Sequence, residues 1–455
     1  MSLAPTRRPA SRPASLRMTA RSGARLSAAA LALLALGACS SNETPRLPGE
    51  RIAIRAAELG ANEEGLIASR PLPPVAESGS WTHAGGDAAH GGGRRQGLAG
   101  APALAWSASV GDAPGEKTLP TGLVAADGRI FARDGAAGVR AFDAASGSVL
   151  WTADLALEGE ESDDAYGGGL AIGPRGRVYA TTGHGEVVAL DPSSGEIAWR
   201  ARGTAPYRGA PVVTGGEVAA VDTANMVRGF SIADGSPAWT VEGLSTRRGN
   251  LGRGAPAGVP GAVLAPFGSG ELAVIRTPSG VRVWSINLSA GAAGEGLSAF
   301  TDVTSGPVVM GGVILAGVAG GPFKGIDGRR GTEIWSRGFG SLSPAWAALD
   351  TAYVVTTEPR ILRIDARTGA TLWSRALEGF EDMEDREDPV AWAGPVLAGD
   401  TVWTVSSDGR LAGFDAVSGQ PGPVVEMPGG ASAGPIAVDG RLHVLTDDGR
   451  LLTYR

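Results

Sequence analysis

The sequence predicts an all-β fold, an eight-bladed β-propeller of four-stranded antiparallel blades in which strands from both chain ends share the last blade. Three observations predict it. A motif of three short strands and two tight turns recurs along the 455 residues, its tryptophans lie 38 to 51 residues apart, and the last copy lacks its final strand. A spacing of about 40–50 residues is that of one propeller blade.

The clearest copy of the motif covers residues 177–200. Glycine-containing turns separate its strands, because glycine reaches the positive φ that tight turns need. A further strand precedes each trio, often after Gly-Pro or Ala-Pro, where proline removes no ladder hydrogen bond. Several units carry Asp, then Gly four residues later, then Trp four residues further, as at Asp191, Gly195 and Trp199.

This three-residue spacing recurs in other units, namely at Asp143, Gly147 and Trp151, at Asp327, Gly331 and Trp335, and at Asp365, Gly369 and Trp373. Two units have Ser231 or Arg276 in place of Asp, and one has Pro423 in place of Trp. We interpret the aspartates as turn caps, because Asp bonds the backbone two residues on; the alternative is a catalytic or metal-binding role.

The recurring tryptophans are Trp106, Trp151, Trp199, Trp239, Trp284, Trp335 and Trp373. Their recurrence at one blade position favours packing between blades, with a ligand-stacking set as the alternative. The chain ends fix the blade count. Residues 432–455 supply three strands and stop where other units place Asp, whereas residues 102–109 form an orphan strand. Joining them makes one shared blade beside seven internal units and leaves no open sheet edge.

Composition excludes several classes of protein. The chain has 71 glycines and 30 prolines, which suit many tight turns rather than helices, and 43% hydrophobic residues, which exclude global disorder. A net charge of −7 argues against nucleic-acid binding, which usually needs a basic face.

The N-terminus has the layout of a secretory signal, with basic residues before the short apolar run 27–36. Leu36-Gly37-Ala38-Cys39 resembles a bacterial lipobox, and Cys39 is the sole cysteine. We therefore expect a signal peptide at 1–38, a lipidated tether at 39–78 and the propeller at 79–455; Met1 and Met18 are both candidate starts. An ordinary signal peptide with a chance cysteine is the alternative. Ser40, where retention signals usually place Asp, implies the outer membrane.

Motifs that carry chemistry are absent from the sequence. The four histidines, His83, His90, His184 and His443, lack zinc-ligand spacing, and no nucleophile-elbow or phosphate-loop motif occurs. The acidic runs near Asp163 and Asp385 lack the spacing of a calcium loop and are interpreted as solvated loops. We expect no catalytic residues, cofactor or metal.

The unit from Gly185 to Trp199 resembles the repeat of pyrroloquinoline quinone (PQQ) dehydrogenases and their propeller relatives. Within that superfamily the chain is similar to the BamB family of outer-membrane lipoproteins, through the lipobox, the 47–51 tether, residues 81–90 and all eight blades. The resemblance implies a non-catalytic scaffold of the β-barrel assembly machinery, lipid-anchored in the outer membrane and facing the periplasm. It would bind the POTRA repeats of BamA; unfolded outer-membrane proteins are further candidate partners.

The family's loop motifs suggest where BamA would bind. One motif matches Asp302-Val303-Thr304, although the second family Asp is Thr304 here. The other matches either Leu251-Gly252-Arg253-Gly254 or the upstream Leu244-Ser245-Thr246-Arg247. The candidate partner-binding residues are thus Arg253, Asp302, Leu251 and Arg247, and the alternative is that they are ordinary loop residues.

Two other functions are alternatives to the scaffold. A periplasmic PQQ-dependent dehydrogenase resembles the chain in blade pattern, but that family carries an adjacent-cysteine disulfide and Glu, Asn and Asp ligands for calcium, a constellation lacking here. A lipoprotein propeller that binds another periplasmic partner is the third possibility.

Overall fold

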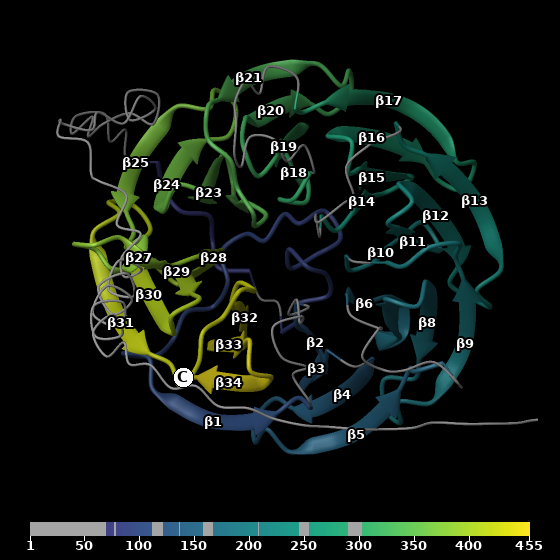
Figure 1. The fold of residues 1–455 in the computed structure, drawn as a ribbon, viewed down its shortest axis with the longest axis horizontal. Coiled ribbons are helices and arrows are strands. Elements are labelled where there is room, and N and C mark those ends of the chain that lie inside the picture. Colours follow the sequence, from purple (N-terminus) through teal and green to yellow (C-terminus); the bar gives the residue numbers. More distant parts are fainter. Residues whose placement is uncertain are drawn as a thin grey trace, which may run out of the picture. The chain divides into compact units, whose positions relative to one another are not determined.

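Eight four-stranded antiparallel sheets are arranged around one axis in the computed structural model, which confirms the predicted eight-bladed propeller (Figure 1). The structure describes residues 70–76, 79–111, 122–135, 137–157, 167–207, 209–244, 254–289 and 303–455, all within the compact unit Ile54–Arg455.

From the inner to the outer strand, the first four blades are β2 (Val124–Ala126), β3 (Arg129–Arg133), β4 (Gly138–Asp143) and β5 (Val149–Asp154); β6 (Gly168–Ile172), β7 (Val178–Thr182), β8 (Glu186–Leu190) and β9 (Ile197–Arg202); β10 (Val212–Thr214), β11 (Glu217–Val221), β12 (Met226–Ser231) and β13 (Pro237–Glu242); and β14 (Ala257–Val259), β15 (Ala262–Pro266), β16 (Glu271–Arg276) and β17 (Val281–Asn287).

The remaining blades are β18 (Val308–Met310), β19 (Val313–Gly317), β20 (Phe323–Asp327) and β21 (Glu333–Arg337); β22 (Trp346–Ala348), β23 (Thr351–Thr356), β24 (Arg360–Asp365) and β25 (Thr371–Ala376); β28 (Trp392–Ala398), β29 (Thr401–Ser406), β30 (Arg410–Asp415) and β31 (Pro421–Glu426); and β32 (Ile436–Val438), β33 (Arg441–Leu445), β34 (Arg450–Tyr454) and β1 (Leu104–Ser109). A hairpin, β26 (Phe380–Asp382) with β27 (Glu387–Pro389), and one 3-10 turn, η3 (Pro174–Gly176), lie outside the blades.

The last blade is closed by strands from both ends of the described chain, as predicted. Strand β1 pairs antiparallel with β34, with Trp106 opposite Thr453 and Ser109 opposite Arg450. Ala103 and Arg455 extend the pairing through two backbone hydrogen bonds of 3.1 and 3.0 Å. The closing pairing completes the fourth strand of the last blade, so the ring consists of eight complete four-stranded blades.

Each tryptophan of the outer strand contacts a turn glycine of the next blade. A Cβ atom added to Gly195 would lie 2.5 Å from the ring of Trp151, so only glycine fits beneath the indole. Gly195 also has φ +74°, which disfavours other residues. The same contact joins Trp106 to Gly147, Trp199 to Gly235, Trp239 to Gly280, Trp284 to Gly331, Trp335 to Gly369 and Trp373 to Gly419.

The indole N–H groups continue the contact between blades. Trp151 Nε1 donates to the carbonyl of Pro192 at 3.0 Å, and Trp199, Trp284, Trp335 and Trp373 bond equivalent carbonyls at 3.0–3.3 Å. Trp106 Nε1 has no partner within the described chain, and the equivalent carbonyl, that of Ala144, accepts a hydrogen bond from Arg441 at 2.7 Å.

The recurring aspartates cap turns, as predicted. Asp191 Oδ1 accepts hydrogen bonds from the amides of Ser193 and Ser194 at 2.8 and 3.1 Å. Asp143, Asp327, Asp365 and Asp415 accept the same pair of amide bonds. Where Ser231 replaces Asp, its hydroxyl oxygen accepts from the amide of Ala233 at 3.2 Å.

Pro423 replaces the outer-strand tryptophan for a structural reason. Its blade, β28–β31, precedes the closing blade, in which β34 and β1 come from distant parts of the sequence. No Asp–Gly turn can join these two strands, so a tryptophan at 423 would have no glycine to cover. The departure follows from ring closure and needs no ligand to explain it.

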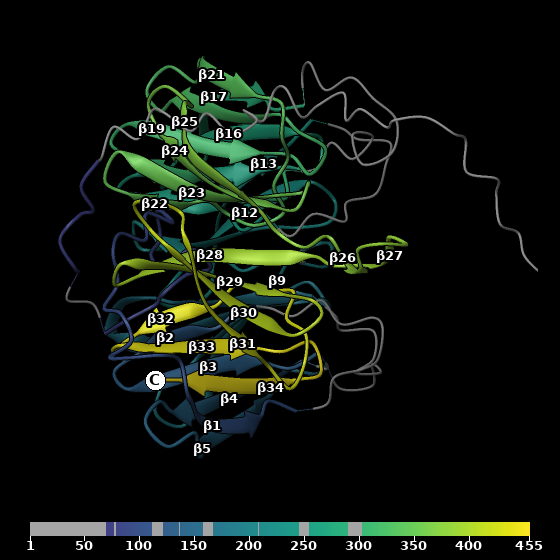
Figure 2. The ribbon, with the colours of Figure 1, turned by 90° about the vertical axis from the view of Figure 1, so that its left-hand side faces the viewer.

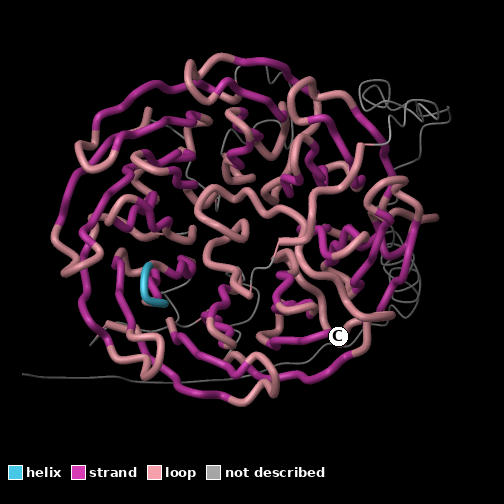
Figure 3. Tube along the Cα trace, turned by 180° about the vertical axis from the view of Figure 1, so that it is seen from behind, coloured by secondary structure: helices cyan, strands magenta, loops and turns pink. Residues whose placement is uncertain are grey.

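The segment 79–97, which we call the strap, runs once around the inside of the ring (Figures 1 and 3). It bonds the first strand of seven blades in succession, through Trp81 to Ala125, Thr82 to Ile172, His83 to Val213, Ala88 to Gly258, Ala89 to Val309, Gly93 to Ala347 and Arg95 to Leu397. Both ends of the strap approach the eighth blade: a Cβ atom on Gly79 would lie 2.9 Å from Asp439, and one on Gly440 would lie 3.2 Å from the carbonyl of Gly97. The strap therefore ties all eight blades together.

Candidate functional site

The two faces of the propeller carry different kinds of loop. The turn face carries the Asp–Gly turns, and the connection face carries the segments that lead from the outer strand of one blade to the inner strand of the next. The strap lies toward the turn face, whereas the β26–β27 hairpin projects from the connection face (Figure 2). Long connections therefore gather on one face only, which makes it the natural place for partner contacts.

The predicted partner-binding residues Arg247, Leu251, Arg253 and Asp302 lie outside the described residues, as does the predicted lipidation site Cys39. The residues next to the two predicted segments are described and touch each other. A Cβ atom on Gly254 would lie 2.2 Å from the carbonyl oxygen of Val303. The segments 245–253 and 290–302 thus rejoin the propeller at adjacent points of the connection face.

A buried polar network holds the base of the segment 245–253. The carboxylate of Glu271, which is 1% exposed, accepts a hydrogen bond from the amide of Leu244 at 2.8 Å and pairs with Arg282 at 2.8 Å. Asn225 donates to the carbonyl of Leu244 at 2.6 Å and accepts from the amide of Gly268 at 2.9 Å. The sequence did not lead us to Glu271 or Asn225. Glu186 begins β8 as Glu271 begins β16, and Glu186 pairs with Arg200 as Glu271 pairs with Arg282, so this recurrence could have indicated Glu271.

An axial cavity of about 160 Å³ lies where the first strands begin. Leu123, Ala255, Gly306 and Gly434 contribute to its wall, and the strap residues Trp81, Ala84 and Gly85 line its inner end together with Trp346 of β22. The strap therefore closes the ring axis toward the turn face. The sequence did not predict this cavity, because its wall comes from residues spread over more than 300 positions.

The cavity floor is a rigid aromatic stack. The rings of Trp81 and Trp346 lie 5.1 Å apart at an interplanar angle of 17°, and Trp346 Nε1 donates to the carbonyl of Gly93 at 2.7 Å. The guanidinium carbon of Arg95 lies 5.4 and 6.0 Å from the two ring centroids, and its Nη1 donates to the carbonyl of Ser80 at 3.0 Å. Stacking and cation–π contacts thus fix the strap against β22.

Two buried histidines of the strap, His83 and His90, are neutral and bond the strap to the blades. His83 Nε2 accepts the amide hydrogen of Val213 at 3.0 Å, so Nδ1 carries the proton and donates to Thr82 Oγ1 at 2.9 Å. Burial, together with a smaller effect of the nearby His90, lowers the pKa of His83 to about 3. His90 Nδ1 donates to the carbonyl of Pro307 at 2.9 Å, and burial lowers its pKa as well.

Acid is expected to destabilise the propeller through His83. In the unfolded chain a histidine takes a proton near pH 6.5, whereas folded His83 stays neutral down to a pKa of about 3. The unfolded state therefore binds more protons in this window, and stability falls by about 1.4 kcal/mol per pH unit below pH 6.5. His83→Gln should make the free energy of unfolding, measured by urea denaturation between pH 6.5 and 5, less steep in pH.

A second histidine serves as the internal comparison. Burial lowers the pKa of His443 to about 3 as well, and its Nδ1 lies 2.7 Å from Thr453 Oγ1 in another part of the ring. His443→Gln should therefore reduce the pH slope by a similar amount, and the double variant by both amounts. A slope that neither change alters would contradict the neutral assignment of both rings.

The acidic run near Asp385 forms the β26–β27 hairpin rather than an irregular loop. Residues 381–389 are all exposed, and Glu384 and Asp385 donate their amides to Asp382 Oδ1 at 2.8 and 2.9 Å. The acidic pair near Asp163 lies outside the described residues. Within the described ranges no three His, Cys, Asp or Glu side chains form a group that could hold a metal ion.

Comparison with protein families identifies the family of the chain. Residues 135–375 and 363–455 match the family described as outer membrane protein assembly factor BamB. The chain belongs to the BamB family. It is 25% identical to BamB of Yersinia pestis, over 78% of this chain and 86% of the relative, and 28% identical to BamB of Salmonella typhimurium, over 76% and 87%. Membership of an assembly-factor family agrees with the expectation of a protein that is not an enzyme.

Solved structures show the same fold in BamB proteins and in quinone enzymes. BamB from Moraxella catarrhalis covers 78% of this chain and 99% of its own length with a TM-score of 0.65 and 17% identity. Quinohemoprotein alcohol dehydrogenase from Comamonas testosteroni covers 84% and 81% with a TM-score of 0.61 and 16% identity. At these identities the likeness concerns the fold alone.

The axial cavity of this BamB-family chain does not fit the quinone of the enzymes. PQQ carries three carboxylates and is held with calcium, so its site needs cations and carboxylate ligands. Among the residues that the structure describes, the cavity wall contains glycine, alanine, proline, serine, threonine, leucine, isoleucine and tryptophan, and no charged residue. An anion without a cationic partner would be costly to bury there.

Proposed function

We propose that the chain is a non-catalytic lipoprotein scaffold of the outer-membrane β-barrel assembly machinery. It binds the POTRA repeats of BamA and assists the folding and insertion of outer-membrane proteins. Membership of the BamB family supports the scaffold role. The observation that carries the site is the contact between Gly254 and Val303, because it brings the ends of the two candidate binding segments together on the connection face.

We propose the same division of the chain as the sequence suggests: a signal peptide at 1–38, a tether from the lipidated Cys39 to residue 78, and the propeller at 79–455. In the outer membrane this anchor would hold the protein on the periplasmic side. No helix long and apolar enough to span a membrane occurs among the residues that the structure describes.

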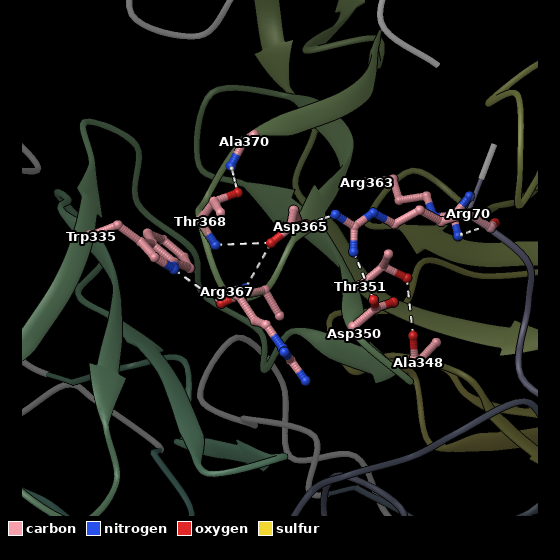
Figure 4. A network of polar contacts seen from close by, with 11 residues as sticks. Arg70, Trp335, Ala348, Asp350, Thr351, Arg363, Asp365, Arg367, Thr368 and Ala370 are labelled. Carbon is pink, nitrogen blue, oxygen red and sulfur yellow. Dashed lines mark hydrogen bonds and ion pairs between the residues drawn. The ribbon is translucent and has the colours of Figure 1, made fainter. Parts of the chain in front are cut away.

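The end of the tether docks on the propeller (Figure 4). Arg70 Nη1 pairs with Asp350 Oδ2 at 2.7 Å, Arg70 also pairs with Asp365, and Arg363 donates to the carbonyl of Arg70 at 3.0 Å. Asp350 and Asp365 lie at turns of the blade β22–β25, on the turn face. The docked tether therefore leaves the connection face free for BamA.

The charge-reversal pair Arg253→Glu and Asp302→Arg tests this site. If the two segments bind POTRA repeats, the variant loses at least tenfold in co-purification with BamA while its thermal unfolding stays unchanged, because neither position belongs to a described strand. The measurement is the ratio of BamA to tagged protein recovered from solubilised membranes.

A matched control reverses one positive and one negative charge on the turn face. Arg329→Glu with Glu196→Arg is suitable, since both side chains are exposed there. The control should keep BamA at the wild-type ratio. Equal recovery of BamA by both double variants would reject the proposed binding site.

A further inference from the structure

Residues 70–76, which we call the latch, lie in an extended seat on the turn face. The seat is formed by Asp350, Arg363 and Asp365 of the blade β22–β25 and by Arg94 of the strap (Figure 4). Asp365 also caps its own turn, so the blade holds this carboxylate in place before any ligand arrives. The seat therefore offers two fixed negative charges to the first side chain of the latch.

The latch presents main-chain oxygens to two guanidinium groups of the seat. Arg363 donates to the carbonyl of Arg70 at 3.0 Å, and Arg94 donates to the carbonyl of Pro73 at 3.3 Å. These carbonyls are three residues apart, and the three prolines of the latch favour the polyproline II conformation, which has three residues per turn. Both acceptors therefore point to the same side, and the prolines have no N–H group that would need a partner.

The end of the latch pairs with the strap. Val75 forms a parallel bridge with Arg94, and the amide of Ala76 donates to the carbonyl of Arg94 at 2.7 Å. The next strap residue, Arg95, forms a parallel bridge with Ala398 of β28. Latch, strap and β28 are thus three neighbouring extended segments, and the latch covers the edge of the strap at Arg94.

Arg94 connects the latch to the ring. Its side chain donates to the carbonyl of Gly399 at 3.0 Å and pairs with Asp400 at 2.5 Å, in the turn that follows β28. Removal of the latch takes away the bonds of Arg94 to Pro73 and Ala76. The position of the latch and the order of the strap end are therefore coupled through one residue.

The latch is held less firmly than the strap. Pro71, Pro74, Val75 and Ala76 are exposed, and Leu72 is only partly buried against the core. A segment that buries few apolar groups opens locally without unfolding the whole domain. Such a segment can leave its seat while the propeller stays folded.

We infer that the seat is a recognition site for an extended Arg-Pro-x-Pro peptide, that the latch is its ligand within the same chain, and that release of the latch loosens the strap end at Arg94. A seated latch holds the strap, and a displaced latch frees it. The inference goes beyond the proposed function and does not depend on it, because every contact that supports it lies on the turn face.

Arg70→Glu in the full chain tests the coupling. Glutamate is repelled by Asp350 and Asp365, so hydrogen exchange followed by mass spectrometry should become at least tenfold faster in fragments 70–76 and 92–97. Exchange around Trp81, at the other end of the strap, should keep its wild-type rate. Faster exchange of the latch without any change in fragment 92–97 would overturn the coupling.

Two further variants make the comparison independent of folding defects. Asp350→Asn removes the more exposed of the two carboxylates and should speed exchange of both fragments about threefold with normal thermal unfolding. Arg329→Glu makes the same charge change as Arg70→Glu at an exposed turn of the blade β18–β21 and should leave both fragments unchanged. Equal effects of Arg329→Glu and Arg70→Glu would contradict a specific seat.

A separate peptide tests recognition. A segment attached to its site has an effective concentration on the order of 1 mM, so acetyl-Arg-Pro-Leu-Pro-Pro-Val-Ala-amide is added to the Arg70→Glu protein at about 10 mM. It should restore slow exchange in fragment 92–97, whereas the same peptide with glutamate in first place should not. Equal effects of the two peptides, or no effect of the arginine peptide, would overturn the recognition site. BamA is absent from this assay, so its outcome is separate from that of the BamA co-purification.

Discussion

Deletion of residues 79–97 is expected to cost most of the stability of the propeller. His83 and the main chain of the strap make ten hydrogen bonds of 2.6–3.0 Å with the first strands of seven blades, two of them between Trp81 and Ala125 and two between Arg95 and β28 or its turn. Each contributes roughly 0.5–1.5 kcal/mol, and the whole domain has about 5–15 kcal/mol. The deletion also exposes the ring of Trp346, which is 3% exposed in the intact protein.

Thermal unfolding followed by circular dichroism measures this effect. We expect the strapless protein to lose its cooperative transition or to unfold at least 15 °C lower than the full chain. Deletion of residues 51–69, which precede the docked Arg70, is the length-matched comparison and should change little. A strapless protein with the wild-type midpoint would mean that β1–β34 pairing alone closes the ring.

Trp151→Ala is expected to destabilise the protein by about 3–5 kcal/mol, as is typical when a large buried aromatic side chain is truncated. The ring is 8% exposed and covers Gly195, and its Nε1–H bond to Pro192 is lost as well. Trp151→Phe keeps most of the apolar contact and should cost less. Urea denaturation gives both free energies of unfolding.

The glycine side of the same contact provides a matched comparison. Gly195 and Gly261 have φ of +74° and +81°, so alanine costs about 1–2 kcal/mol at either position. An added Cβ meets the Trp151 ring at 2.5 Å in the first case and has nothing within 4 Å in the second. Gly195→Ala should therefore cost clearly more than Gly261→Ala; equal costs would show that the indole moves aside freely.

The repeating parts of the fold were predictable because the same contact recurs at a fixed spacing. Asp191, Gly195 and Trp199 occupy equivalent places in several units, so their copies identify turn caps and inter-blade packing, and the missing strand after Tyr454 identifies the closure. The path of the strap could not be predicted, although residues 81–90 resemble the family. His83 bonds Val213, which lies 130 residues further along the chain, and Arg95 bonds Leu397, which lies about 300 residues further; no periodic pattern in the sequence indicates such contacts.

In the candidate site, too, only the residues that belong to sequence motifs could be predicted. Family motifs pointed to Arg253 and Asp302, whereas the network of Glu271 and Asn225 around Leu244 and the Trp81–Trp346 floor exist only once the blades close into a ring. Both candidate residues remain predictions, since they lie outside the described residues.

The central claim is that this propeller is a scaffold of the β-barrel assembly machinery. The most direct measurement is isolation of the tagged full-length lipoprotein from its native outer membranes in mild detergent, with quantitative mass spectrometry of the proteins that accompany it. We expect BamA, with its POTRA repeats, as a near-stoichiometric partner. Recovery of folded, lipidated protein without BamA, or with a different stoichiometric partner, would contradict the claim.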